Sequence, residues 1–360
     1  LARRTFGPVP GTDGPATALL ASLFAAISPF QVYYAQEARM YILVTLLGLC
    51  AMLAYRRYLA GYEQEGDGGA WARRGALYIL ASVLAIYSHY FAFSLLLAQN
   101  VGFVVWLIRQ ARQRPQKAFP WRPILRWGAI QALILLCYAP WLALSWRSLE
   151  AWPAVGAPLS LSALLTKIAQ VLPLGITVGE NTGTRLVGLL LSLLVLPGIF
   201  WPGPAQGDRP GAQRRPSGRL MTALYLLVPI GVLYASSLSR PMYKPKFVLL
   251  ATPAYHILQA YGIVALGYSV KRMIKTSWAR AAVTLVLTSM VCAASGYSLF
   301  NLYTDEAYFR DDYRGIVNYI DATASPEDAI LINAPSQSET VDYYYHGPLP
   351  HALIFSFKKT

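Results

Sequence analysis

Long apolar segments alternate with short polar ones along almost the whole chain. The clearest case runs from residue 75 to residue 108, where there is no Asp, Glu, Lys or Arg. About 20 apolar residues are enough to cross a bilayer as a helix, so this run predicts two spans that fold back at "SHYF", Ser88 to Phe91. Over the whole sequence the pattern predicts nine spans, near residues 16–32, 41–59, 75–90, 91–108, 124–146, 184–201, 220–238, 247–270 and 279–302.

Two segments outside these spans have patterns of their own. In the loop from 148 to 180, apolar residues from Leu161 to Leu172 recur at helical spacing, which predicts an amphipathic helix lying in the membrane interface. Residues 303–360 are more polar, with one apolar helical face in "DYRGIVNYI" and a predicted strand at "AILINA". We therefore expect a transmembrane domain over 1–302 and a small external α/β domain over 303–360, which looks incomplete.

Composition leads to the same class of protein. Hydrophobic residues make up 55% of the 360 residues and charged residues only 13%, and the mean hydropathy is +0.39. Soluble globular domains carry about twice that share of charged residues. The predicted fold class is therefore an all-α polytopic membrane protein with a small C-terminal external α/β segment.

The formal net charge of +14 is distributed in a way that predicts topology. Lys and Arg gather in alternate loops, near the N-terminus and at 55–74, 109–126, 202–219 and 271–280, which contain few acidic residues. Basic loops are retained on the cytoplasmic side of a membrane, so these loops are expected inside and the others outside. Because the basic residues are dispersed over separate loops, the charge does not indicate nucleic-acid binding.

The outward loop "YYAQEARMY" is the first candidate for chemistry, because it places Glu37 and Arg39 beside Tyr41 at the membrane surface. Loops carry function more often than cores do. The alternative is a solvated ion pair flanked by tyrosines of the interfacial aromatic belt, which needs no functional explanation.

A second outward loop, "SRPMYKPKF", contains Arg240, Lys244 and Lys246 together with Tyr243. Three cations in this space suit a phosphate group, although they would also suit a lipid-headgroup anchor. His89 at the "SHYF" turn completes the outward set. It could bind phosphate or a metal, or it could be a structural histidine.

Five segments, in their order along the chain, resemble bacterial membrane glycosyltransferases of the C superfamily. The resemblance is to proteins similar to protein mannosyltransferases and aminoarabinose transferases, often called glycosyltransferase family 39, and it covers nearly the whole chain. The segments are "SPFQVYYAQEARMY", "SHYFAFSLLLAQN", "RPMYKPKFVLLATPAY", "DDYRGIVNYIDATASPEDAILINAP" and "DYYYHGPLP".

The resemblance implies an enzyme that transfers a sugar from a polyprenyl-phosphate donor to a protein, lipid or glycan acceptor. The reaction would take place on the outer side of the cytoplasmic membrane. A glycosyl phosphate already has a good leaving group, so the site needs a base for the acceptor hydroxyl and cations for the departing phosphate. Direct displacement at the anomeric carbon, with inversion, is the implied mechanism.

In this family the principal catalytic Asp lies in the first outward loop, and the sequence, which begins with Leu1, starts after that point. Both ends look cut, so we expect the main base to be absent from the chain. Glu37 is then an auxiliary acidic residue. The expected substrate-binding residues are Arg39, Tyr41, His89, Arg240, Tyr243, Lys244 and Lys246. The family's Arg-Tyr pair is spaced differently in "RPMYKPK", which leaves open which cation meets the phosphate.

Two other classes of function remain alternatives. A transporter or lipid flippase would be favoured by ionisable residues deep within the spans, and the sequence shows almost none. A non-catalytic membrane scaffold would tolerate neutralising both Glu37 and Arg240. The sequence leaves the cofactors unspecified. Participation of a divalent metal stays open, because no metal-ligand spacing is visible. The sequence does not specify which sugar moves.

Overall fold

The computed structural model describes residues 14–37, 39–61, 68–113, 120–150, 158–201, 218–241, 243–333 and 337–353. The predicted cytoplasmic loops fall largely at 1–13, 62–67, 114–119 and 202–217, outside the described residues. The chain forms two compact units, Leu1–Thr304 and Asp305–Thr360, and each is described by itself.

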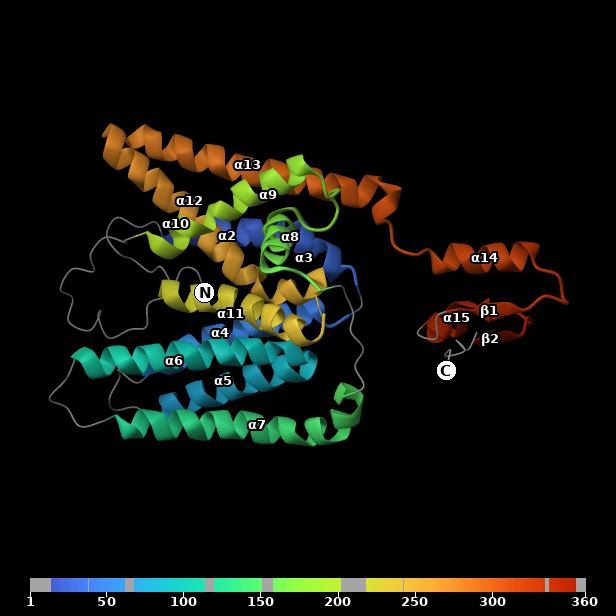
Figure 1. Ribbon diagram of the computed structural model, residues 1–360, viewed down its shortest axis with the longest axis horizontal. Helices are drawn as coiled ribbons and strands as arrows, with labels where there is room; N and C mark the ends of the chain where they lie inside the picture. Colours follow the sequence, from blue (N-terminus) through green and yellow to red (C-terminus); the bar gives the residue numbers. More distant parts are fainter. Residues whose placement is uncertain are drawn as a thin grey trace. The chain divides into compact units, whose positions relative to one another are not determined.

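The described part of the first unit is a helical bundle (Figure 1). Its helices are α2 (Gly14–Ala26), α3 (Pro29–Ala35), α4 (Tyr41–Gly61), α5 (Gly68–Ser88), η1 (Tyr90–Ala92), α6 (Phe93–Gln113), α7 (Trp121–Glu150), α8 (Leu161–Leu174), α9 (Thr182–Leu193), α10 (Val195–Phe200), α11 (Gly218–Ser239), η3 (Pro245–Ala251), α12 (Thr252–Ile274) and α13 (Ser277–Thr304).

Seven helical segments of the described chain are long and apolar enough to cross a membrane, which makes this a multi-pass membrane protein. They are Tyr41–Gly61, Tyr90–Arg112, Trp121–Arg147, Thr182–Phe200, Gly218–Ser239, Pro245–Ile274 and Trp278–Thr304. The predicted count of nine is not confirmed. The predicted span at 75–90 is part of α5, a helix of 21 residues that is not among the seven.

The predicted span at 16–32 is a bent pair of helices rather than one straight helix. The chain bends by 50° between α2 and α3. Ser28 is extended there, and its hydroxyl accepts the Gln31 N–H at 3.4 Å, which caps α3. Pro29 occupies the first turn of α3, where its missing N–H costs nothing. The bend therefore follows from a cap and a proline that a hydropathy pattern does not register.

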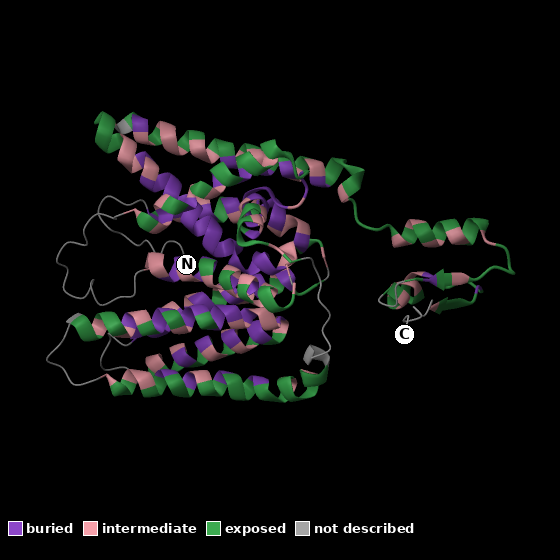
Figure 2. Cartoon of the chain, viewed as in Figure 1, coloured by how far each residue is buried: buried purple, intermediate pink, exposed green. Residues whose placement is uncertain are grey.

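Helix α12 forms the centre of the first unit, with the most apolar window of its span fully buried (Figure 2). Helix α10 packs against it with almost no space between the backbones. A Cβ atom added at Gly198 would collide with the Leu258 carbonyl, and one at Gly262 would collide with the Leu194 carbonyl. Small residues allow this close approach of helices in membranes.

A second packed region joins α4, α5, α6 and α7 through aromatic rings and amides. The Trp127 ring stacks on Phe103, with ring centroids 4.7 Å apart, and on Tyr78, at 5.5 Å. The Tyr78 hydroxyl donates to Gln99 Oε1 at 2.8 Å, and Trp127 Nε1 donates to Asn100 Oδ1 at 2.8 Å. Rings and amides thus satisfy one another inside the bundle.

The second unit contains η4 (Glu306–Tyr308), α14 (Tyr313–Thr323), β1 (Ile330–Ile332), α15 (Ser338–Tyr344) and β2 (His351–Leu353). The strands are parallel, with Ile330 opposite His351. No residue of α14 is buried against the described part of the unit, and Ile316 is 53% exposed. The location of this unit outside the membrane stays a prediction.

Candidate functional site

Three separate segments meet at one end of the bundle, where α4 and α6 begin and α5 and α11 end. We call this the site end. Tyr41 is the first residue of α4, His89 lies between α5 and η1, and Lys246 is the second residue of η3. The sequence predicted each of these residues as part of a substrate site, from three different loops. The structure brings them into contact.

The Lys246 ammonium lies over the face of the Tyr41 ring, with Nζ 4.7 Å from the ring centroid. The His89 ring lies 5.8 Å from the Tyr41 ring and 5.7 Å from the Phe247 ring, measured between centroids. An ammonium over an aromatic face is attracted by the electron density of the ring. The cation is therefore held in a defined place at the surface of the bundle.

Local backbone geometry fixes the orientation of His89. The residue is extended, with φ −161° and ψ 127°, and it caps η1 by accepting the Phe91 N–H on Nδ1 at 3.0 Å. Its side chain is only 7% exposed. Burial, and secondarily the charge of Lys246, lowers the pKa of His89 to about 4. The neutral imidazole therefore carries its proton on Nε2, since Nδ1 is an acceptor.

A small pocket, with room for about one water molecule, opens at this cluster. Its wall combines the three polar residues with an apolar surface, and it is lined by Tyr41, Val44, His89, Phe91, Ala92, Lys246, Phe247 and Leu250. Because the pocket is so small, a larger ligand would lie across its opening. One ammonium beside an apolar wall matches the chemistry of an anionic group attached to a hydrocarbon chain.

The other residues predicted for the site also lie near the ends of these helices, outside the pocket. Glu37 is half-buried in the turn between α3 and α4, and Arg39 is exposed in the same turn. Arg240 is exposed just after the end of α11, and Lys244 is the half-buried residue that precedes η3. The Arg39 N–H donates to the Glu37 carbonyl at 2.7 Å, so the backbone turn links the two residues.

Tyr243 is packed against the apolar core, and its hydroxyl makes no hydrogen bond with any residue that the structure describes. Burial raises the pKa of Tyr243, and the nearby Glu180 carboxylate raises it further. The neutral phenol is thus strongly favoured at this position.

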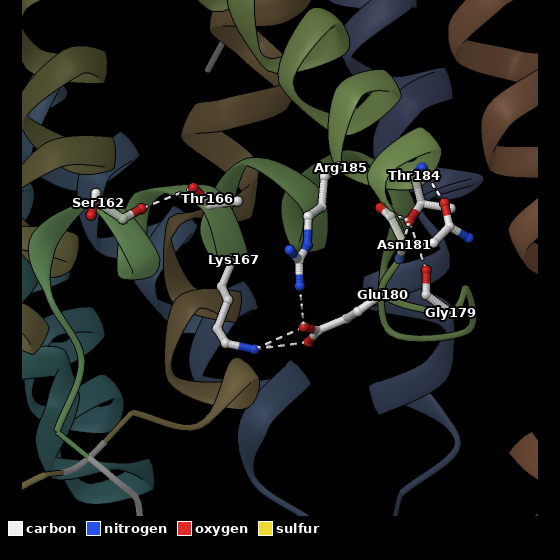
Figure 3. A network of polar contacts seen from close by, with 8 residues as sticks. All are labelled: Ser162, Thr166, Lys167, Gly179, Glu180, Asn181, Thr184 and Arg185. Carbon is white, nitrogen blue, oxygen red and sulfur yellow. Dashed lines mark hydrogen bonds and ion pairs between the residues drawn. The ribbon is translucent and has the colours of Figure 1, made fainter.

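A charged network that the sequence pattern does not predict joins α8, the loop after it and α9. Glu180 accepts from Lys167 Nζ at 2.8 Å, and Arg185 lies 3.5 Å away on its other side (Figure 3). The hydrogen bond from Lys167 lowers the pKa of Glu180. The sequence predicts an amphipathic helix in this segment, and α8 (Leu161–Leu174) confirms the helix. Its place in the membrane interface stays a prediction. The helical pattern around Lys167 does not indicate that its side chain contacts Glu180, which lies 13 residues further along the chain.

Among the described residues there is no group of three or more His, Cys, Asp or Glu side chains that could hold a metal ion. The site end is therefore built from cations, aromatic rings and single carboxylates in the described part of the chain.

The chain matches no protein-family model, no curated protein and no solved structure. The resemblance to C-superfamily glycosyltransferases thus rests on the sequence segments alone.

Proposed function

We propose that the protein transfers a sugar from a polyprenyl-phosphate donor to an acceptor on the outer side of the cytoplasmic membrane. The observation that carries the proposal is the Lys246 ammonium, held over Tyr41 beside the neutral His89 at an apolar pocket. Lys246 would bind the phosphate by charge, and His89 Nε2–H would donate to a phosphate oxygen. Phe91, Phe247 and Leu250 would contact the first part of the prenyl chain.

In the proposed reaction the acceptor oxygen attacks the anomeric carbon, and the bond from that carbon to the phosphate oxygen breaks. The phosphate leaves with the bonding electron pair, while the acceptor proton passes to a carboxylate base. Direct displacement inverts the anomeric configuration. Glu37 serves as the auxiliary acidic residue, and Arg39, Arg240, Tyr243 and Lys244 complete the substrate-binding surface.

The proposal includes a topology. Nine segments cross the membrane, with α5 and the α2–α3 pair added to the seven apolar spans, and the site end faces outward. The segment after the last span, 303–360, then lies outside as well. The basic loops supply the physical argument for this orientation, because they connect the opposite ends of the helices.

The test is sugar transfer from a radiolabelled polyprenyl-phosphate donor pool by membranes that contain the full-length protein. Replacement Lys246→Ala should lower transfer by about 100-fold, as expected when a charge-stabilising group is removed. Glu37→Gln and Arg240→Ala should lower it as well. The matched control is Lys271→Ala, which removes an exposed cation at the other end of α12. Transfer that is unaffected by Lys246→Ala at normal expression would overturn the site assignment.

A second candidate function is transport of a lipid or solute. It is favoured by His256 and Gln259, which are buried inside α12, because buried polar residues within a membrane span are commonly functional. Absence of sugar transfer by the wild-type protein, together with donor-independent lipid or solute movement in vesicles, would support this candidate.

A further inference from the structure

The segment that carries Lys246 has an unusual conformation. Residues Pro245–Ala251 form seven residues of 3₁₀-helix that lead directly into α12 at Thr252. Runs of 3₁₀-helix longer than three or four residues are uncommon, and they often mark functional segments. Phe247 to Ala251 are all buried, so this conformation is part of the packed interior. A specific cause should therefore hold it.

Pro253 supplies that cause. If α12 continued upstream as an α-helix, the N–H of residue 253 would bond to the Leu249 carbonyl, four residues earlier. Proline has no N–H, and its ring crowds that carbonyl. The Leu249 carbonyl instead accepts the N–H of Thr252, three residues on, and the Thr252 hydroxyl at 2.8 Å. Both bonds are possible when the preceding turn is 3₁₀.

Thr252 also connects this turn to another helix. Its hydroxyl accepts from Gln31 Nε2 at 2.8 Å, and Gln31 belongs to α3. The hydroxyl thus donates to one partner and accepts from another while it is fully buried. Removing this hydroxyl would take a hydrogen-bond partner from the half-buried Gln31 amide and break the link between α3 and this turn.

The helical form of η3 determines the position of Lys246. A 3₁₀-helix turns about 120° and rises about 2.0 Å per residue, whereas an α-helix turns about 100° and rises about 1.5 Å. Lys246 lies six residues before Thr252. Rewinding those residues into an α-helix would swing Lys246 by roughly 120° about the axis and draw it in by about 3 Å. It would then lose its place over the Tyr41 ring.

We propose that Pro253, Thr252 and Gln31 are positioning residues that hold η3 in its 3₁₀ form and so set the place of the Lys246 ammonium against Tyr41 and His89. The inference concerns the same site as the proposed function. It can be tested without measuring sugar transfer, because it predicts that residues 41 and 246 are close together.

The experiment uses the full-length protein with Cys50, Cys137 and Cys292 replaced by Ala, and with Tyr41→Cys and Lys246→Cys introduced as a pair. A short thiol-to-thiol cross-linker such as dibromobimane, whose product fluoresces only when both cysteines react, reports whether the two positions are adjacent. The pair should cross-link efficiently in this background. Adding Pro253→Ala or Thr252→Val should lower the cross-linking yield at least threefold. Adding Thr252→Ser instead, which keeps the hydroxyl, should leave the yield as high as in the parent pair.

The matched control is Pro140→Ala, because Pro140 also lies inside a helix but is exposed on α7. It should leave the yield unchanged. If Pro253→Ala does not fold, as judged by gel filtration in detergent, the inference is tested by comparing the cross-linking yields of Thr252→Val and Thr252→Ser. A yield that is unchanged in a folded Thr252→Val protein would overturn the inference.

Transfer measurements separate this inference from the proposed function. In the protein with native cysteines, Thr252→Val should raise the donor KM more than Thr252→Ser does. If the wild-type protein transfers no sugar but the cross-linking results hold, the proposed function fails and the positioning role stands. If transfer depends on Lys246 but the yield does not depend on Thr252, the positioning role fails and the proposed function stands.

Discussion

The Nζ atom of Lys246 lies 4.7 Å from the centroid of the Tyr41 ring, although the two residues are 205 positions apart in the sequence. One begins α4 and the other lies in η3, so their contact depends on the packing of η3 against α4. The ring presents a negative face that holds the ammonium without neutralising it. The lysine thus keeps its charge for an anionic ligand while its position is restricted.

Tyr41→Leu should therefore weaken the site without abolishing it. Loss of the ring removes a contact of about 1 kcal/mol and the pre-organisation of the cation, so the donor KM should rise by about fivefold. Tyr41→Phe keeps the aromatic face and should stay within about twofold of wild type. Steady-state transfer by purified protein in detergent or vesicles measures both. Equal losses in the two variants would mean that the hydroxyl, not the ring, is what matters.

His89 should make stability depend on pH. Its pKa in the folded protein is about 4, below its ordinary value of 6.5, so the unfolded chain binds a proton that the folded protein does not. The stabilising contribution is complete above pH 6.5 and is lost as the pH falls toward 4. The loss amounts to about 3 kcal/mol for this single group.

Thermal unfolding in detergent between pH 7.5 and pH 4.5 measures this effect. His89→Gln should reduce the pH dependence of the melting temperature, whereas the control His346→Gln, which changes an exposed histidine of the second unit, should leave it as in the wild type. A melting temperature of the wild-type protein that is independent of pH over this range would contradict the prediction.

The main helices could be predicted from the sequence because each is a long apolar run. The predicted segment 41–59 is α4, Tyr41–Gly61, and 220–238 is α11, Gly218–Ser239. The predicted break at "SHYF" is confirmed, with α5 ending at Ser88 and η1 beginning at Tyr90. Such breaks are visible because a single helix of that length would exceed the thickness of a bilayer.

The site was predictable only as separate residue types. Tyr41, His89 and Lys246 were each predicted as site residues because they are charged or aromatic and lie in loops. Nothing in the local sequence sets the distance between them. The 3₁₀ segment was hidden inside the predicted span 247–270, because hydropathy does not distinguish 3₁₀ from α. The Lys167–Glu180 contact depends on how α8 and α9 fold onto each other, which is a tertiary property.

The Glu180 network should contribute little to stability. Its members are substantially exposed, with side-chain exposures of 34% for Lys167 and 52% for both Glu180 and Arg185. Exposed ion pairs contribute about 0–1 kcal/mol and are screened by salt. Glu180→Gln should therefore lower the free energy of unfolding by less than about 1 kcal/mol. The difference from wild type should shrink in 1 M salt. Denaturant titration at low and high salt measures it, and a large loss that persists at high salt would show another role for Glu180.

The amide and ring cluster around Trp127 should contribute far more, because its members are buried in the bundle. Gln99→Leu removes the acceptor of the Tyr78 hydroxyl and should cost about 1–3 kcal/mol, since a buried polar group loses its partner. Trp127→Ala also leaves a cavity beside Phe103 and should cost about 3–5 kcal/mol. Leu136→Ala on the exposed face of α7, where Leu136 is 68% exposed, is the matched control. Unfolding by sodium dodecyl sulfate in mixed micelles ranks the three variants. A Gln99→Leu protein as stable as the Leu136→Ala control would show that packing, rather than this hydrogen bond, holds α5 to α6.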